Sequence, residues 1–173
     1  MVTIKIKKIF ITFLCAFSVA CSQEEDSFDV IKKFEGIRTQ AYYDDAGVLT
    51  IGYGHTEGVK LGDKITVKQA DIIFEKDLKY YKKIVDEMVI VETNKSINVA
   101  LVSFTYNLGA GSLKRSTLLK KLNSGDYIGA SKEFNKWVYV GKRKSKGLFK
   151  RRCDERRIFE RGIKKISRRY GVR

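Results

Sequence analysis

The sequence has few residues of the kinds that bind metals. It contains one histidine, His55, and three cysteines, Cys15, Cys21 and Cys153, and no two cysteines have the Cys-x-x-Cys spacing. Because protein zinc sites draw most of their ligands from cysteine and histidine, we expect no metal site. Three cysteines cannot all pair with one another. A Cys21–Cys153 disulfide in an oxidising compartment and two free thiols both remain open.

Proline is absent altogether, for which the sequence offers no physical reason, and long hydrophobic runs are absent as well. The N-terminal apolar stretch covers only residues 9–20, whereas a relaxed membrane-spanning helix needs about 20 residues. Lysines precede it and small residues end it, a layout typical of export signals. We therefore assign residues 1–20 to an export signal or signal-anchor, leading to the periplasm or cell envelope, and residues 21–26 to a short acidic linker. Cleavage after Ala20, lipidation at Cys21 and retention as a transient membrane anchor all remain open.

Acidic residues are too few to balance the basic ones, so the chain carries a formal net charge of +15. Residues 141–173 contain 15 Lys or Arg and 3 acidic residues, which gives this region +12 of the total. Such a charge density favours attraction to an anionic cell-wall or membrane surface over a merely solvated helix face. Nucleic acid is the competing polyanion, but the export signal and the lack of a recognisable nucleic-acid module argue against it.

Hydrophobic residues are plentiful, at 43% of the chain, which excludes disorder, and their periodicity predicts one α+β domain over residues 27–173. Residues 27–35 have a helical pattern, and Gly36 follows as a helix stop. Two β-prone runs then predict a hairpin, with strands at residues 40–43 and 48–53.

Helices dominate the remainder of the domain. Thr66 and Gln69 form a capping-box pattern. Residues 97–104 are apolar almost all round, which predicts a central buried helix that Gly109 and Gly111 end. Further helices are predicted over residues 113–122, 127–138 and 149–162. The outline is a small β-hairpin lobe beside a larger helical lobe, with a cleft between them.

Three polar residues could converge on this cleft. Glu35 ends the first helix, while Asp44 and Thr50 flank the hairpin turn. Splitting a glycosidic bond needs an acid that protonates the leaving oxygen and a carboxylate that activates water or stabilises positive charge. Desolvation by Phe34 would favour the protonated acid at Glu35, a wet turn would keep Asp44 ionised, and the Thr50 hydroxyl could hold the attacking water. Spacing alone does not distinguish this set from a solvated hairpin.

The surrounding residues resemble a known family. Glu35, Asp44 and Thr50, followed directly by Ile51-Gly-Tyr-Gly-His-Thr56, are similar to the catalytic signature of phage-type lysozymes (glycoside hydrolase family 24), which include the lambdoid endolysins. The resemblance continues in unbroken order as far as Arg161. It is carried there by residues 100–109, 115–119, 122–127, 134–139, 147–152 and 155–156.

The resemblance implies hydrolysis of the β-1,4 bond between N-acetylmuramic acid and N-acetylglucosamine in peptidoglycan, without a cofactor and with inversion. It implies Glu35 as the proton donor, Asp44 as the second carboxylate and Thr50 as the residue that positions water. The spacing favours Asp44 over its neighbour Asp45. Some exported relatives have cysteine in place of Asp44 as part of a disulfide switch, so the aspartate here puts that form of redox control in doubt.

Other conspicuous residues have mainly structural interpretations. We expect the lone His55 to pair with a carboxylate and fix the lobe rather than to act as a base. Gly52 and Gly54 lack the setting of a nucleotide loop, so we expect them to permit tight turns. Tyr106 and Asn107 match a family segment that lines the sugar groove. Packing on a sugar and a hydrogen bond to an acetamido group are expected there, although an ordinary role at a helix end remains open.

Two other functions remain open beside a monomeric endolysin that breaks down the cell wall and lyses the host. A cationic wall-, membrane- or nucleic-acid-binding protein could use the basic C-terminal region on an inactive lysozyme fold. A lytic transglycosylase would cut the same bond and leave an anhydro end, but Asp44 and Thr50 serve direct attack by water and argue against it.

Trp137 and Tyr139 are expected in the core.

Overall fold

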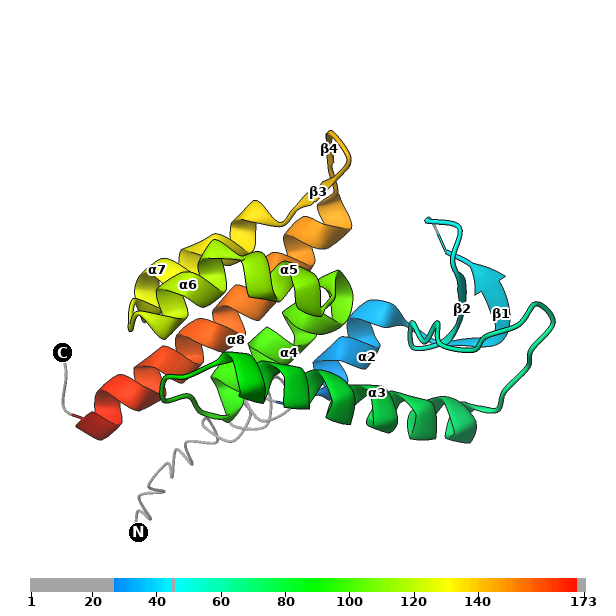
Figure 1. The fold of residues 1–173 in the computed structure, drawn as a ribbon, viewed down its shortest axis with the longest axis horizontal. Coiled ribbons are helices and arrows are strands. Elements are labelled where there is room, and N and C mark those ends of the chain that lie inside the picture. The colour runs from blue at the N-terminus through cyan, green and yellow to red at the C-terminus, as the bar shows by residue number, and fades with distance from the viewer. Residues whose placement is uncertain (1–26, 45, 171–173) are drawn as a thin grey trace, which may run out of the picture.

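The computed structural model describes residues 27–44 and 46–170, and Figure 1 shows these as two parts of unequal size. We call residues 37–65 the hairpin lobe, and α2 together with residues 66–170 the helical body. The predicted export signal, the acidic linker and Asp45 lie outside the described residues. Within the described residues, no helix combines the length and the apolar character that crossing a membrane requires.

The first elements form as the sequence predicts. Helix α2 (Asp29–Glu35) ends at Gly36, whose φ of 66° lies in the left-handed region that glycine tolerates best. Strands β1 (Arg38–Tyr43) and β2 (Leu49–Gly52) pair antiparallel, with Tyr42 opposite Thr50. The hairpin is therefore confirmed, and its turn lies between Tyr43 and Leu49.

The long helices α3 (Val67–Met88) and α4 (Lys95–Leu108) also match the prediction. Thr66 and Gln69 cap α3 reciprocally, because each side chain accepts a hydrogen bond from the other residue's backbone N–H. Helix α4 runs through the centre of the helical body (Figure 1) and buries nine of its residues.

The middle of the helical body departs from the prediction. The helix predicted over residues 113–122 is two helices, α5 (Ala110–Arg115) and α6 (Thr117–Asn123). They are separate because Ser116 is extended and its hydroxyl caps α6 by accepting from the Leu119 N–H at 3.0 Å. Gly109 alone ends α4, while Gly111 lies inside α5.

The C-terminal third contains a hairpin that was not predicted. Helix α7 (Tyr127–Glu133) and the 3₁₀ helix η1 (Phe134–Lys136) end before Val138. Strands β3 (Tyr139–Val140) and β4 (Arg143–Lys144) then form a short hairpin that projects from the helical body (Figure 1). Helix α8 (Lys146–Tyr170) follows and is longer than expected. Trp137 packs against Phe104 as expected, whereas Tyr139 is 60% exposed, so placing it in the core was wrong.

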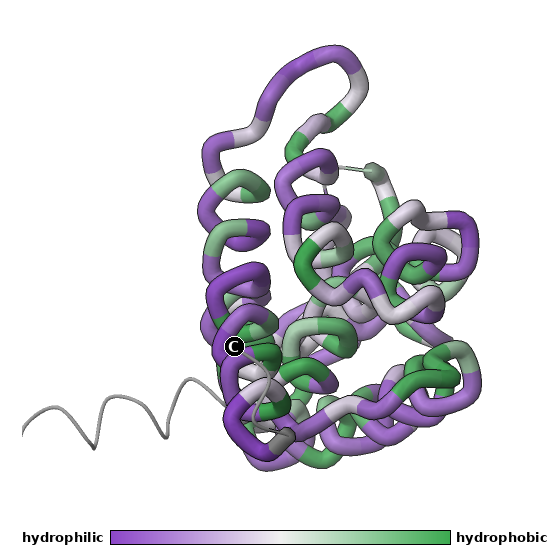
Figure 2. Tube along the Cα trace, turned by 90° about the vertical axis from the view of Figure 1, so that its left-hand side faces the viewer, coloured by the Kyte–Doolittle hydropathy of each residue, from purple (hydrophilic) through white to green (hydrophobic). Residues whose placement is uncertain are grey.

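One hydrophobic core holds the helical body together. Figure 2 shows hydrophobic positions where the helices face one another and hydrophilic positions along their outer sides. Phe104, Phe134 and Phe159 form a chain of ring contacts with centroids 5.5 and 5.4 Å apart. Helices α4 and α8 pack along each other at the centre of this core, and this packing brings residues of α8 beneath the end of α2.

Candidate active site

Glu35 is the last residue of α2, and its carboxylate is paired with a cation from the other end of the chain. Arg151 of α8 donates from Nη1 to Glu35 Oε1 at 2.6 Å, and the two side chains are only 6% and 19% exposed. The expected neighbour Phe34 instead lies against this guanidinium, with its ring centroid 5.0 Å from the Arg151 Cζ atom. The sequence interpretation expected an apolar neighbour for this carboxyl group, so the paired cation differs from that expectation.

Asp44 follows β1 directly, at the start of the hairpin turn. Its Oδ1 atom accepts hydrogen bonds from the backbone N–H groups of Ala46 at 2.9 Å and Val48 at 2.8 Å. Aspartate bends the chain in this way at many turns. The turn therefore holds a carboxylate in a fixed position at the tip of the hairpin lobe.

Thr50 lies on β2 and is almost completely buried, with 3% of its surface exposed. Its hydroxyl donates to the Val48 carbonyl at 3.0 Å, which leaves the lone pairs of Oγ1 to accept from another group. Val48 thus contacts both residues, since its N–H binds Asp44 and its carbonyl binds Thr50. No hydrogen bond joins any two of Glu35, Asp44 and Thr50 among the residues described.

Gly54 is a residue of the hairpin lobe that packs closely against Glu35. Its φ is 89°, and a Cβ atom at this position would lie 3.4 Å from Glu35 Oε2 and 3.8 Å from the Tyr106 ring. Gly52 has a φ of 67° and packs against Ala70 of α3. Both glycines therefore have the turn conformations expected of them.

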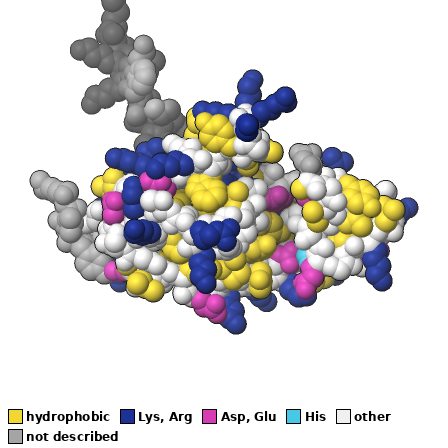
Figure 3. All heavy atoms as spheres, turned by 45° about the horizontal axis from the view of Figure 1, so that its top comes forward, with side chains coloured by type: hydrophobic (Ala, Val, Ile, Leu, Met, Phe, Trp, Pro, Cys, Tyr) yellow, Lys and Arg dark blue, Asp and Glu magenta, His cyan; other side chains and the backbone are white. Residues whose placement is uncertain are grey.

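Figure 3 shows the surface hollowed between the two parts of the molecule, with acidic side chains in the notch.

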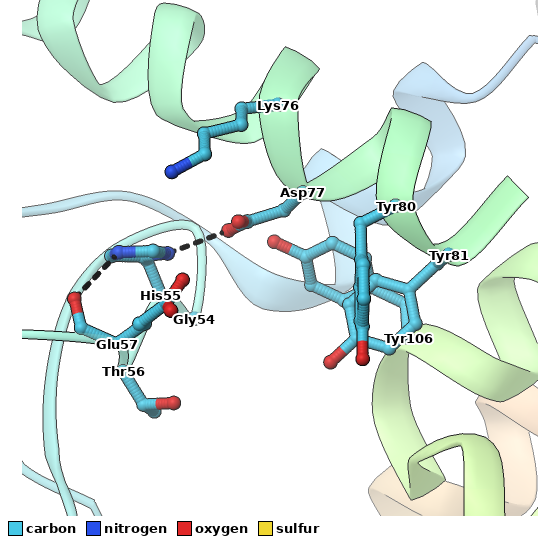
Figure 4. A pocket seen from close by; sticks show the side chains of 9 residues that line it. All are labelled: Gly54, His55, Thr56, Glu57, Lys76, Asp77, Tyr80, Tyr81 and Tyr106. Atoms are coloured by element: carbon cyan, nitrogen blue, oxygen red, sulfur yellow. Dashed lines mark hydrogen bonds and ion pairs between the residues drawn. The ribbon is translucent and has the colours of Figure 1, made fainter. Parts of the chain in front are cut away.

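A cavity of about 330 Å³ lies beside Gly54, between the hairpin lobe and helices α3 and α4. In Figure 4, His55 and its neighbours form one wall, and the rings of Tyr80, Tyr81 and Tyr106 face them from the other side. The His55 ring bridges the lobes, because Nδ1 lies 2.8 Å from an Asp77 carboxylate oxygen of α3 and Nε2 lies 3.0 Å from the Glu57 carbonyl oxygen.

Tyr106 and Asn107, at the end of α4, both have polar partners within the protein. The Tyr106 hydroxyl donates to the Tyr53 carbonyl at 2.7 Å, and burial raises the pKa of Tyr106, so this hydroxyl stays protonated. The Asn107 Oδ1 atom accepts from Arg152 Nη2 at 3.0 Å. Tyr106 lines the cavity, whereas Asn107 does not.

The sequence interpretation missed the buried charges beneath the site. Arg151, Arg152 and Glu155 of α8 are 5%, 0% and 0% exposed, although they belong to the region expected to attract anionic surfaces. The available signal was their spacing, because Glu155 follows the two arginines by four and three residues and so shares a helix face with both.

Groups of His, Cys, Asp or Glu suited to a metal are absent from residues 27–44 and 46–170.

Comparisons with known proteins identify relatives of the chain. Residues 32–155 match the family model described as phage lysozyme. The chain is 41% identical over 140 residues to an endolysin of Acyrthosiphon pisum secondary endosymbiont phage 1, a match that covers 79% of this chain and 96% of that protein. It is 38% identical over 125 residues to a SAR-endolysin of Bacteriophage PS119, covering 72% and 75%. Among solved structures, the muramidase domain of SpmX from Asticaccaulis excentricus has a TM-score of 0.71 at 31% identity, covering 76% of this chain and 92% of that one.

Proposed function

The chain belongs to the phage lysozyme family, and we propose that it hydrolyses the β-1,4 bond between N-acetylmuramic acid and N-acetylglucosamine with Glu35, Asp44 and Thr50. Membership makes it a glycoside hydrolase of the endolysin type, with the α+β lysozyme fold and peptidoglycan as its substrate. The choice of bond and the roles of the three residues rest on the geometry and chemistry of the site.

In the proposed reaction, protonated Glu35 gives its proton to the glycosidic oxygen as the bond from that oxygen to the anomeric carbon breaks. Thr50 accepts a hydrogen bond from a water molecule through the lone pairs that Val48 leaves available. Asp44 takes a proton from that water as the water oxygen attacks the anomeric carbon. The products are a new reducing end and a free hydroxyl, and proton exchange with solvent restores both carboxyl groups.

The observation that carries this assignment is the position of Glu35. Its carboxyl group lies where the hairpin lobe meets the helical body, next to Gly54. Gly54 and Tyr106 line the cavity, whereas Glu35, Asp44 and Thr50 lie outside its lining. Asp44 and Thr50 come from the hairpin lobe, and Val48 fixes both. An acid on one lobe and a carboxylate with a water-binding hydroxyl on the other match what hydrolysis needs on the two sides of a sugar.

Digestion of purified peptidoglycan, with mass analysis of the fragments, tests the reaction. Fragments with reducing ends support hydrolysis, anhydro ends would indicate a lytic transglycosylase, and no fragments would indicate a binding protein on an inactive fold. Glu35→Gln keeps the shape of the side chain but removes its proton-donating acid, so cleavage should fall by about 10³-fold. The variant should keep the circular dichroism spectrum of the wild type. Cleavage at the wild-type rate would refute the role of Glu35.

The proposal extends to where the enzyme works. Several relatives are described as SAR-endolysins, and this supports export to the periplasm through the N-terminal segment. That the protein works as a monomer stays a prediction from the sequence. The intact mass of protein from the envelope distinguishes cleavage after Ala20, lipidation at Cys21 and an uncut anchor. Cys153 is half-buried with a free thiol, and its candidate partner Cys21 lies outside the described residues.

The basic C-terminal region supports an anionic surface as an additional partner. Tyr139 and Val140 are 60% and 63% exposed on the β3–β4 hairpin, beside exposed Lys142, Arg143 and Lys144. Charge attraction at such a surface is screened by salt. Replacing these three cations with serine should weaken binding to cell walls at low salt and leave little difference from the wild type at high salt. A loss of the same size at every salt concentration would contradict an electrostatic contact.

A further inference from the structure

Glu155 is a fully buried carboxylate at the centre of the network beneath the site. Its Oε1 atom accepts hydrogen bonds from the Ser103 hydroxyl at 2.7 Å, Arg151 Nε at 3.1 Å and Arg152 Nη2 at 3.0 Å. Its Oε2 atom lies 3.0 Å from Arg152 Nε. A buried carboxylate with this many partners is held in a single position, because every displacement would break contacts that water cannot replace.

The first branch of the network leads from Glu155 to Glu35. Arg151 contacts Glu155 through Nε, the Ser103 carbonyl through Nη2 at 3.1 Å and Glu35 through Nη1 at 2.6 Å. The guanidinium is planar and rigid, so the contacts to Glu155 and Ser103 determine where Nη1 points. Glu155 therefore sets the position of Arg151, the cation that touches Glu35.

The second branch leads from Glu155 to Asn107. Arg152 is 0% exposed, its Cζ atom lies 5.0 Å from the Phe104 ring centroid, and its Nη2 atom donates to both Glu155 and Asn107 at 3.0 Å. Burial lowers the pKa of Arg152 to about 10, so this guanidinium is still charged at neutral pH. Glu155 thus orients Arg151 beside Glu35. It also orients Arg152 beside Asn107.

The charges in the network balance when Glu35 is ionised. Two guanidinium groups face two carboxylates, Glu35 and Glu155. Burial raises the pKa of Glu155, and the two guanidinium groups and the Ser103 hydroxyl oppose this shift. Without Glu155 both guanidinium charges would act on Glu35. Two further titratable groups, Tyr81 of α3 and Tyr106 of α4, also interact with Glu35. Burial raises the pKa of both tyrosines, so they remain neutral. Asp77 of α3 acts on the same two rings.

We propose that Glu155 is a positioning residue of the reaction, which offsets the charge of Arg151 so that Glu35 can hold its proton and orients Asn107 through Arg152. The inference rests on the proposed function, because it assigns to Glu35 the role of acid. It resolves the conflict between that role and the arginine beside it. Arg151 fixes the carboxyl group in place, and Glu155 pairs with the same guanidinium and so offsets part of its charge.

The test compares the wild type with Glu155→Gln. Loss of one negative charge leaves Glu35 among more positive surroundings, so the alkaline limb of the kcat/KM profile should move by roughly one unit to lower pH. Release of Arg151 and Arg152 should also lower kcat by about tenfold or more and raise KM by about threefold. An alkaline limb and KM equal to those of the wild type would overturn the proposal.

Glu133 provides a matched control elsewhere in the molecule. It is 3% exposed and is paired with Lys121 at 2.6 Å and Lys136 at 2.8 Å, and none of these residues touches the site. Glu133→Gln should therefore lower stability but leave the pH profile and KM unchanged. A shift of the same size in both glutamine variants would show a general effect of destabilisation and would overturn the proposal.

The double variant Arg152→Met/Glu155→Gln decides the matter even if the single variant does not fold. It removes one charge of each sign, and apolar replacement of buried ion pairs is often tolerated. The alkaline limb should return to near its wild-type position, whereas KM should stay raised because Asn107 has lost Arg152. A double variant with wild-type KM would overturn the inference. Absence of fragments from the wild type would instead refute the proposed function itself.

Discussion

The hairpin lobe and the helical body hold their residues in place by different means. Among the described residues of the hairpin lobe, only Thr50, Ile51 and Gly52 are buried. The helical body, by contrast, encloses one continuous core of apolar side chains that reaches from α2 to α8. Two of the three proposed active-site residues, Asp44 and Thr50, thus belong to the part of the molecule with almost no core of its own.

Polar contacts with the helical body compensate for this missing core. His55 pairs with Asp77 at 2.8 Å, and Asp71 accepts from both Lys32 at 2.8 Å and the Tyr53 hydroxyl at 3.2 Å. Buried apolar area supplies most of the stability of a domain, whereas directional contacts determine how its parts are oriented. Changes in the apolar core of the helical body should therefore affect stability, and changes to the polar groups of the hairpin lobe should affect activity.

The largest expected effects come from one substitution in each part. Phe104→Ala removes a fully buried ring from the helical body and should lower the free energy of unfolding by about 3–5 kcal/mol. Thr50→Val keeps the shape of a buried side chain and costs only about 1 kcal/mol for the hydroxyl. The valine cannot hold water, so kcat should fall by about 10²-fold. Denaturant unfolding and turbidity clearing of peptidoglycan measure the two quantities.

Thr50→Ser is the control for the second substitution, because serine keeps the hydroxyl and loses only a methyl group. It should retain most of the activity. Thr50→Val with wild-type kcat would exclude the proposed water contact. If Thr50→Val instead unfolded the protein as readily as Phe104→Ala does, the contrast between the two parts would be wrong.

Local signals in the sequence were sufficient for the hairpin lobe and for α2 to α4. Gly36, the Asp44 turn and the Thr66–Gln69 capping box each act within a few residues, so the chain adopts them whatever surrounds it. The proposed acid, carboxylate and hydroxyl also lie within one short segment, but their spacing alone did not distinguish them from a solvated hairpin. The resemblance to phage-type lysozymes selected them, and their roles stay a prediction.

Contacts that packing creates between distant segments of the chain could not be found from local signals. Arg151 reaches Glu35 across 116 positions of the chain, and only the packing of α8 on α4 makes this contact. The basic character of the C-terminal region also concealed that Arg151 and Arg152 are buried. The break at Ser116 depends on one helix cap, and the β3–β4 hairpin depends on one turn. The apolar pattern was also compatible with the longer helices predicted from the sequence.

A smaller effect should come from the glycine at the junction of the two parts. Gly54→Ala forces a φ of 89° on a residue with a Cβ atom 3.4 Å from Glu35 Oε2. Backbone strain should cost about 1–2 kcal/mol, and crowding of the acid should lower kcat by about tenfold. Gly62→Ala is the control, since Gly62 has a φ of 93° with no atom within 4 Å of the added methyl group. Equal kcat values for the two variants would show that Gly54 is needed only for its backbone conformation and not for the space it leaves beside Glu35.

The smallest expected effect concerns Asp71, which connects α2 and the hairpin lobe to α3. The hydrogen bond from Lys32 lowers the pKa of Asp71 below its ordinary value of 3.8. Because the folded value is below the unfolded one, the contribution to stability is fully present above 3.8 and is lost as the pH falls through the folded value. Asp71→Asn should therefore lower Tm at pH 7 and make little difference in strongly acidic solution.

The comparison needs Tm values for wild type and variant at both pH values, with Asp86→Asn as the control. Asp86 forms an exposed pair with Lys82 within α3 and connects no two parts of the molecule, so its loss should change Tm less. The group at Asp71 is itself exposed to solvent, which keeps the expected difference small. A Tm difference for Asp71→Asn that persists undiminished in acid would show that the carboxylate charge is not its cause. The contact would then act through the shape of the side chain rather than through its pairing with Lys32.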